Sequence, residues 1–135
     1  MKVRAIDEGR RGREKELVRS DYFRKHGGTA LPVYIGTLEY VVITASVRLG
    51  KNAYGAAIRR EIMSSTGDVC STSAISASID NLEAKGFVQC SMSTPTGERG
   101  GRTKRMVLVT RSGKWVARSF YNWVMTASRG TPWED

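Results

Sequence analysis

The chain has 135 residues, 40% of them hydrophobic, and a formal net charge of +9 with an isoelectric point near 10.0. This length corresponds to one domain with a modest core, and the excess of Lys and Arg favours a polyanionic partner, most often nucleic acid. No apolar run reaches the roughly 18 residues that span a bilayer, and no signal peptide is present, so we expect a cytoplasmic protein that does not bind membranes.

The sequence offers few residues with which to build a metal site or a catalytic centre. A single histidine, His26, and the two cysteines Cys70 and Cys90 cannot supply the usual zinc ligands, and we expect both thiols to be reduced. The chain also lacks a phosphate-binding loop, a well-placed Cys–His pair and a carboxylate cluster. We therefore expect no enzyme activity, no cofactor and no metal.

Residues 1–33 differ in composition from the rest of the chain. Charges of both signs dominate them, and Gly27-Gly28 and Pro32 separate them from the next segment. Apolar side chains at helical spacing predict a short helix over residues 14–25. We expect a basic N-terminal arm, partly helical or disordered, that can add backbone or minor-groove contacts to DNA.

Three helices are predicted from the spacing of apolar residues and from their capping residues. Apolar residues recur at intervals of three and four over residues 35–49 and predict the first helix. The second begins within residues 52–55 and ends at Gly67, and Ser71 caps the third, which ends at Gly86. The inward side chains of the second and third helices are expected to be Tyr54, Ile58, Ile62, Ile75, Ile79 and Leu82.

The outward face of the third helix has the composition of a helix that reads DNA. Small and hydroxyl-bearing side chains let a helix approach the major groove closely, and the N–H groups of its first turn can hold a phosphate. Asn81 can contact a base edge. The alternative is an ordinary solvated face with a hydroxyl cap. The residues concerned are Ser71, Thr72, Ser73, Ser76, Ala77, Asp80 and Asn81.

Two strands follow, over residues 87–92 and 106–109. Apolar and polar side chains alternate in the first, whereas the second is continuously apolar and is expected to be the more buried strand. The loop between them contains Gly100-Gly101 and a cluster of basic residues, and such a cationic hairpin tip suits phosphate contacts. A solvated charged loop is the alternative. The basic residues are Arg99, Arg102, Lys104 and Arg105.

A last helix is predicted over residues 112–128, with Thr110 as its N-cap. It carries more large apolar side chains than a small domain can cover on a terminal helix. Such a stripe usually belongs to the core or to a dimer interface. The stripe contains Val116, Phe120, Trp123, Val124 and Ala127, with Trp115 beside it.

The order of elements predicts a winged helix-turn-helix, which is a mostly α-helical α+β fold with a small two-stranded β-hairpin. Residues 34–110 are expected to form the winged helix-turn-helix DNA-binding domain. Residues 111–128 are expected to form a C-terminal dimerisation helix, and residues 129–135 a tail.

Several segments of the sequence resemble the PadR family of bacterial transcriptional regulators. They are residues 36–42 (Gly-Thr-Leu-Glu-Tyr-Val-Val), 53–58 (Ala-Tyr-Gly-Ala-Ala-Ile), 80–86 (Asp-Asn-Leu-Glu-Ala-Lys-Gly), the Gly-rich basic stretch 98–102 and Val109-Thr110. The resemblance covers about residues 36–115. The chain departs from the family pattern where Ser76 replaces a recognition-helix tyrosine and where Met106 and Val107 replace paired tyrosines, and its leader is longer than usual.

This resemblance implies a homodimeric repressor that a small effector often releases from DNA. It also implies that the last helix, with the N-terminal region, forms the dimer, and that the interface can hold a flat aromatic molecule. A packed dimer core without an effector is the alternative. The residues expected to line a dimer contact or effector pocket are Trp115, Phe120, Trp123 and Val124, and Tyr54 is expected to contact the DNA backbone.

The sequence thus predicts a sequence-specific transcriptional regulator that binds double-stranded DNA as a homodimer. Two other classes stay open. One is a non-specific architectural DNA-binding protein that uses only its basic arm and wing. The other is a winged-helix adaptor that binds another protein.

Overall fold

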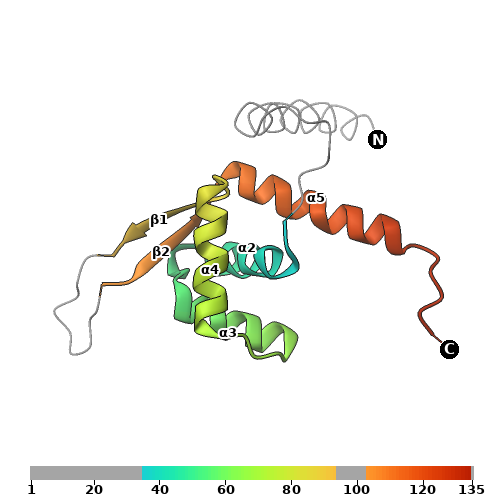
Figure 1. Ribbon diagram of the computed structural model, residues 1–135, viewed down its shortest axis with the longest axis horizontal. Coiled ribbons are helices and arrows are strands. Elements are labelled where there is room, and N and C mark those ends of the chain that lie inside the picture. The colour runs from blue at the N-terminus through green and yellow to red at the C-terminus, as the bar shows by residue number, and fades with distance from the viewer. Residues whose placement is uncertain (1–34, 94–102, 135) are drawn as a thin grey trace, which may run out of the picture. The chain divides into compact units, whose positions relative to one another are not determined.

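A computed structural model of the protein describes residues 35–93 and 103–134. These belong to the unit Tyr34–Asp135, and the predicted N-terminal arm lies outside the described residues. The elements, in chain order, are α2 (Thr37–Leu49), a short 3-10 turn η1 (Gly50–Asn52), α3 (Gly55–Thr66), α4 (Thr72–Ala84), β1 (Val88–Met92), β2 (Arg105–Val109) and α5 (Arg111–Ser128), as Figure 1 shows. This order confirms the predicted winged-helix α+β fold.

Helix α2 is the centre of the described domain. It lies against α3, α4, α5 and β2, so that its buried residues meet side chains from almost every other element. Burial of these apolar side chains supplies the main stabilisation of the fold. The largest fully buried side chains are Phe87, Ile43, Ile58, Ile62, Ile75, Leu82, Val42, Val88 and Val116. The predicted inward stripes of α3 and α4 are confirmed at every isoleucine and leucine named.

The turn between α3 and α4 is made where the sequence predicts it. Gly67 ends α3 with a φ of 78°, and its N–H donates to the carbonyl of Met63 at 2.9 Å. Residues with a side chain adopt this left-handed conformation only at a cost, which explains a glycine here. Four residues later Ser71 starts α4, and its hydroxyl accepts the N–H of Ala74 at 3.1 Å.

The β-hairpin is antiparallel, with a register that runs from Val88 opposite Val109 to Met92 opposite Arg105. Strand β2 is the more buried of the two strands, as expected, since Val107 and Val109 are buried in β2 and Val88 alone in β1, but its burial is not continuous. Val107 is only 3% exposed, but its neighbour Leu108 is 64% exposed. The sheet has two strands and packs one face on the helices, so alternate side chains of a continuously apolar strand must face solvent.

A short backbone contact joins the hairpin to the start of α3. The N–H of Val107 donates to the carbonyl of Ala53 at 2.9 Å, and Tyr54 forms an isolated bridge with Met106. Residues 53 and 54 therefore act as a minimal third strand beside β2. This contact fixes the base of the wing to the helix-turn-helix through the main chain.

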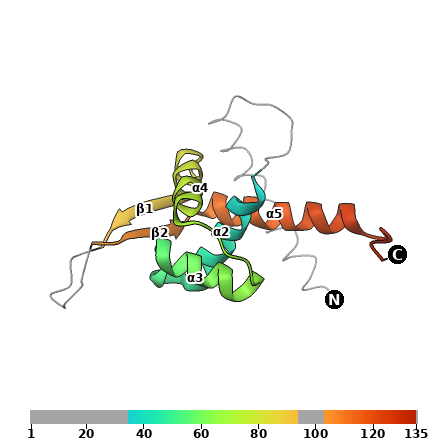
Figure 2. The ribbon, with the colours of Figure 1, turned by 60° about the horizontal axis from the view of Figure 1, so that its bottom comes forward.

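Helix α5 begins in the core and then leaves it. The Thr110 hydroxyl accepts the N–H of Gly113 at 3.1 Å and donates to the carbonyl of Gly86 at 2.8 Å, which anchors the first turn to the end of α4. Val116 is fully buried, and the ring of Phe120 lies 4.9 Å from that of Tyr40. Beyond this point α5 projects away from the other helices in both ribbon views (Figures 1 and 2).

Candidate nucleic-acid interface

The face of α4 opposite the core is polar, small and open to solvent. Ile75, Ile79 and Leu82 point inward and are at most 2% exposed, whereas every residue predicted to face DNA is exposed. Ser78, which the pattern does not single out, is buried beside the apolar stripe. The exposed predicted residues are Ser71, Thr72, Ser73, Ser76, Ala77, Asp80 and Asn81.

The segment that leads into α4 is held by a side chain from α3. The Arg59 Nε atom donates to the carbonyl oxygen of Cys70 at 2.7 Å. A charge-assisted bond of this kind restrains the loop just before the helix, and so helps to set where α4 begins. This role could not be predicted from the sequence, because the partner is a backbone carbonyl 11 residues away.

Two cations converge on Tyr54 at the start of α3. Arg60 Nη2 donates to the Tyr54 hydroxyl oxygen at 3.0 Å, and the Lys104 Nζ atom lies 4.2 Å from the centroid of its ring. These contacts, with the Arg60 hydrogen bond foremost and the Lys104 interaction second, hold the pKa of the Tyr54 phenol below its ordinary value of 10.0. Tyr54 is half-buried and faces these cations, so the expectation of an inward position is only partly right.

The hollow beside this cluster has a volume of about 520 Å³ and is also lined by Asn52, Ser64 and Glu61, whose carboxylate pairs with Arg48 at 3.6 Å. Cationic and hydroxyl groups around an open hollow are the chemistry that holds a phosphate. Arg60 is not among the DNA-binding residues predicted from the sequence. We refer to Tyr54, Arg60 and Lys104 as the α3–wing cluster.

The neighbouring predicted wing residues point in different directions. Lys104 faces Tyr54, whereas Arg105 faces α4, where its guanidinium contacts Asp80 Oδ1 at 2.6 Å and Glu83 Oε1 at 3.3 Å. The hydrogen bond to Asp80 is the main cause of a raised Arg105 pKa. The predictions for Arg99 and Arg102 lie outside the described residues.

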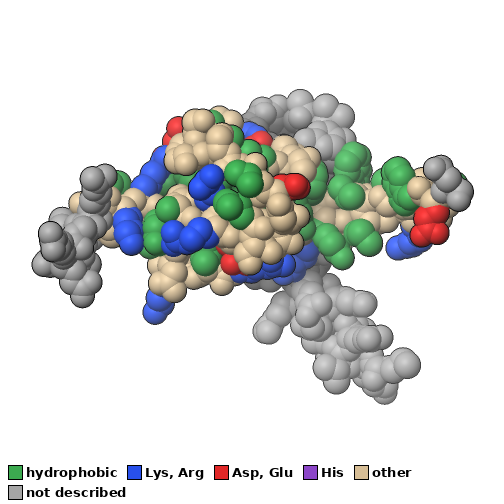
Figure 3. Space-filling model, turned by 90° about the horizontal axis from the view of Figure 1, so that it is seen from below, with side chains coloured by type: hydrophobic (Ala, Val, Ile, Leu, Met, Phe, Trp, Pro, Cys, Tyr) green, Lys and Arg blue, Asp and Glu red, His purple; other side chains and the backbone are tan. Residues whose placement is uncertain are grey.

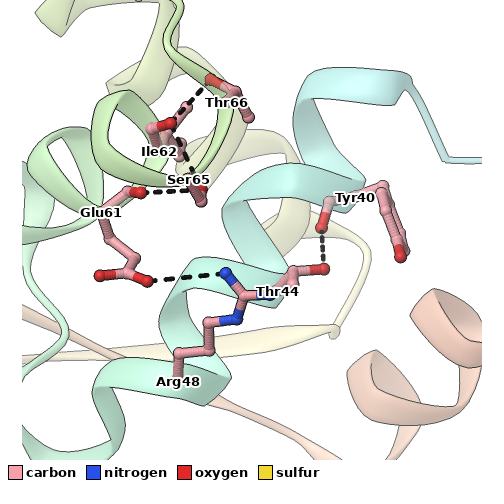
Figure 4. Close-up of polar contacts among 7 residues, drawn as sticks. All are labelled: Tyr40, Thr44, Arg48, Glu61, Ile62, Ser65 and Thr66. Carbon is pink, nitrogen blue, oxygen red and sulfur yellow. Dashed lines mark hydrogen bonds and ion pairs between the residues drawn. The ribbon is translucent and has the colours of Figure 1, made fainter.

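A separate groove of about 390 Å³ lies between α2 and α5. Apolar atoms of Tyr40, Ile43 and Val47 form part of its lining, and Arg48, Lys114 and Arg118 supply positive charge. Figure 4 shows Tyr40 and Arg48 extending from opposite ends of α2, with Arg48 directed to Glu61 of α3 at 3.6 Å.

The residues predicted for a dimer contact or effector pocket do not line this groove. Phe120 packs on Tyr40 at its edge, and Trp115 is half-buried with an indole N–H that has no hydrogen-bond partner among the described residues. Trp123 and Val124 are exposed on the projecting part of α5. In Figure 3 hydrophobic side chains stand along this projection, while Lys and Arg side chains are spread over the body of the domain.

The described residues hold no group of three or more His, Cys, Asp or Glu side chains placed to bind a metal ion. None of the helices within residues 35–93 and 103–134 combines the length and apolarity that a membrane span requires. Cys70 and Cys90 are both free thiols and half-buried.

No protein-family model matches the sequence, and a search of the curated proteins finds no match. Solved structures do resemble the fold. A transcriptional regulator from Clostridium thermocellum has a TM-score of 0.57 at 15% identity, over 76% of this chain and all (100%) of that chain. A structure of the hsRosR-S4 complex has a TM-score of 0.51 at 22% identity, over 71% of this chain and 76% of that chain.

A third similar structure is the Orc1 protein of Aeropyrum pernix in complex with DNA, with a TM-score of 0.56 at 18% identity. It covers 93% of this chain and 30% of that chain. At these identities the similarity concerns the fold. The chain therefore has a winged helix-turn-helix fold, in which α3 and α4 form the helix-turn-helix and β1 and β2 form the wing.

Proposed function

We propose that the protein is a sequence-specific DNA-binding transcriptional regulator of the PadR type that acts as a homodimeric repressor. The observation that carries this proposal is the exposed face of α4, where small hydroxyl and amide side chains stand opposite a fully buried apolar stripe. A solvated helix face would tolerate long charged side chains equally well. Small polar residues instead allow the helix axis to approach the floor of a major groove.

In this proposal α4 reads the bases and the α3–wing cluster grips the backbone. Thr72 and Ser73 offer hydroxyls and free backbone N–H groups to a phosphate at the start of α4, and Asn81 contacts a base edge. Tyr54, Arg60 and Lys104 receive a second phosphate from the side of the wing. Arg99 and Arg102 are proposed to add contacts at the hairpin tip.

Two copies of the chain are proposed to join through the exposed part of α5. Tyr121 and Trp123 are each 52% exposed there, and an apolar surface of this kind on a projecting helix suits a second apolar surface. A two-fold dimer would present two α4 helices to half-sites about 34 Å apart, which is one turn of DNA. Occupancy of a promoter would then exclude polymerase.

A small aromatic effector is proposed to release the repressor from DNA. The groove between α2 and α5 supports this part, because it joins the helix at the centre of the DNA-binding domain to the helix of the proposed dimer contact. A ligand there would change the angle between them and so the spacing of the two α4 helices. Because no tryptophan lines this groove, the test is the shift of the melting temperature on addition of aromatic compounds; no shift across a broad panel contradicts effector binding.

The leading test is a gel-shift titration against genomic fragments, followed by footprinting of the preferred fragment. We expect at least one fragment to bind far more tightly than bulk DNA at physiological salt, since specific sites typically exceed non-specific ones by about 10³-fold or more. Equal binding to all fragments would favour the architectural alternative. Absence of DNA binding would favour the adaptor.

The contribution of the α3–wing cluster is tested with Lys104→Ala and Arg60→Ala. Each change removes one cation, so each should weaken binding to all sequences and reduce the slope of log affinity against log salt by about 1. Arg129→Ala is the matched control, because it removes an exposed cation at the end of α5, far from the wing. An unchanged slope in both cluster variants would contradict the proposed phosphate site.

A further inference from the structure

Arg105 is the first residue of β2, at the end of the wing where the chain crosses from β1 to β2. It pairs with Met92 in the last step of the β-ladder before residues 94–102. From this position its guanidinium reaches α4, with Nη1 at 2.6 Å from Asp80 and Nη2 at 3.3 Å from Glu83. Asp80 and Glu83 are three residues apart on the helix and therefore lie on one side of it.

Glu83 also forms a hydrogen bond with the other strand of the wing, β1. Its Oε2 atom accepts the backbone N–H of Cys90 at 3.0 Å, while its Oε1 atom receives Arg105. One carboxylate on α4 thus contacts β1 through the main chain and β2 through a side chain. Arg105 is opposite Met92, two residues along β1 from Cys90, so the two strands are restrained at neighbouring positions of the ladder.

We infer that Arg105, Asp80 and Glu83 form a clamp that fixes the direction of the wing relative to α4, and that Arg105 positions the wing instead of binding a phosphate. The inference rests on the proposed DNA-binding function, since a fixed angle matters only if helix and wing contact one ligand. The guanidinium also offsets part of the negative charge of the two carboxylates on the exposed helix, which would otherwise repel DNA more strongly.

The exposure of the clamp separates this role from a purely structural one. The side chains of Arg105, Asp80 and Glu83 are 35%, 64% and 44% exposed, and exposed ion pairs contribute little to folding stability. Loss of the clamp should therefore leave the melting temperature nearly unchanged. Its effect should appear in wing motion and in DNA affinity.

The experiment is a double-mutant cycle on DNA affinity, with Arg105→Ala, the pair Asp80→Ala and Glu83→Ala, and all three together. For the clamp we expect Arg105→Ala to weaken binding about tenfold alone and less than about twofold when both carboxylates are absent. Equal losses in the two backgrounds would show a direct phosphate contact and overturn the inference. Lys104→Ala is the control, and its loss should be the same in both backgrounds because Lys104 faces Tyr54.

The variant Arg105→Lys distinguishes the clamp from a phosphate contact in a second way. Lysine keeps the charge but cannot contact two carboxylates with a planar fork. The clamp predicts that Arg105→Lys behaves like Arg105→Ala, whereas a phosphate contact predicts affinity near that of the wild type.

Amide hydrogen exchange in the free protein gives a readout that does not involve DNA. The clamp predicts that the Cys90 amide exchanges about tenfold faster in Glu83→Ala, and that the Ser93 amide, which donates to Lys104 O at 2.8 Å, exchanges faster in Arg105→Ala. Unchanged exchange at both amides would overturn the inference. Wild-type protein that binds no DNA would instead overturn the proposed function, while the exchange rates would still decide whether the wing is held.

Discussion

Helices α4 and α5 begin in the same way and end differently. Each starts at a hydroxyl that accepts a backbone N–H three residues on, from Ala74 to Ser71 and from Gly113 to Thr110. Helix α4 then buries its whole apolar stripe, whereas α5 buries only its N-terminal part. The exposed face of α4 is polar and that of α5 is apolar, which suits the first to a hydrated polyanion and the second to a protein surface.

The largest expected effect on stability comes from a substitution in the packed part of α5. A Cβ atom on Gly113 would overlap the carbonyl oxygen of Phe87 and lie 2.9 Å from Val109 Cγ1, so α5 has to approach the hairpin through a glycine. Gly113→Ala should reduce the free energy of unfolding by about 3 kcal/mol, as measured by urea denaturation. Gly55→Ala is the control, because nothing lies within 4 Å of its added Cβ. Wild-type stability in Gly113→Ala would contradict this packing.

The exposed part of α5 should behave in the opposite way. Trp123→Glu with Val124→Glu should change the stability of the isolated subunit little, because these side chains are 52% and 37% exposed, but weaken self-association by about 100-fold if they are central to a dimer. Analytical ultracentrifugation measures this. Asn122→Glu adds the same kind of charge on a side of the helix away from the stripe and should have little effect. Unchanged self-association of the double variant would show that this part of α5 does not form the dimer interface.

A smaller difference is expected between the contributions of the two helix caps to the free energy of unfolding. Thr110→Ala should cost about 1 to 2 kcal/mol of unfolding free energy and Ser71→Ala about 0.5 to 1 kcal/mol. The reason is that Thr110 is part-buried and also donates to Gly86 O at 2.8 Å, whereas Ser71 is exposed. Thr110→Ser keeps the hydroxyl and should retain most of the stability. Equal costs for both alanine variants would mean that the bond to Gly86 contributes nothing.

The smallest expected effect is the acid titration of Glu83 on α4. Hydrogen bonding to the Cys90 thiol, followed by the Cys90 N–H and Arg105, holds the pKa of Glu83 below its ordinary value of 4.5. Because the folded pKa is the lower one, its contribution to stability is complete above pH 4.5 and is lost as the pH falls through the folded pKa. NMR titration should give a midpoint below 4.5 that rises toward 4.5 in Cys90→Ala. A wild-type midpoint above 4.5 would contradict the contacts.

The positions of the helices could be predicted from the sequence because their causes are local. Ser71 and Thr110 cap helices through atoms three residues away, and Gly67 ends one through its own φ. The exposed face of α4 follows from the same helical period. These features need no knowledge of what packs against them.

The features that escaped prediction depend on neighbours distant in sequence. Lys104 and Arg105 look alike in a basic run, and strand alternation predicts that they point apart, but not that Tyr54 lies on one side and Asp80 on the other. The exposure of Leu108 likewise follows from which face of the hairpin the helices cover. Only the folded chain brings these partners together.

The length of α5 has a mechanical consequence. Its 18 residues give a rigid rod of about 27 Å, because an α-helix rises about 1.5 Å per residue. If two copies are joined near the far end of this rod, it acts as a lever, and a rotation of about 5° at the joint would displace each DNA-binding domain by roughly 2 Å. A modest adjustment at the joint would then be amplified into a mismatch with the pitch of DNA, without any deformation of the domain itself.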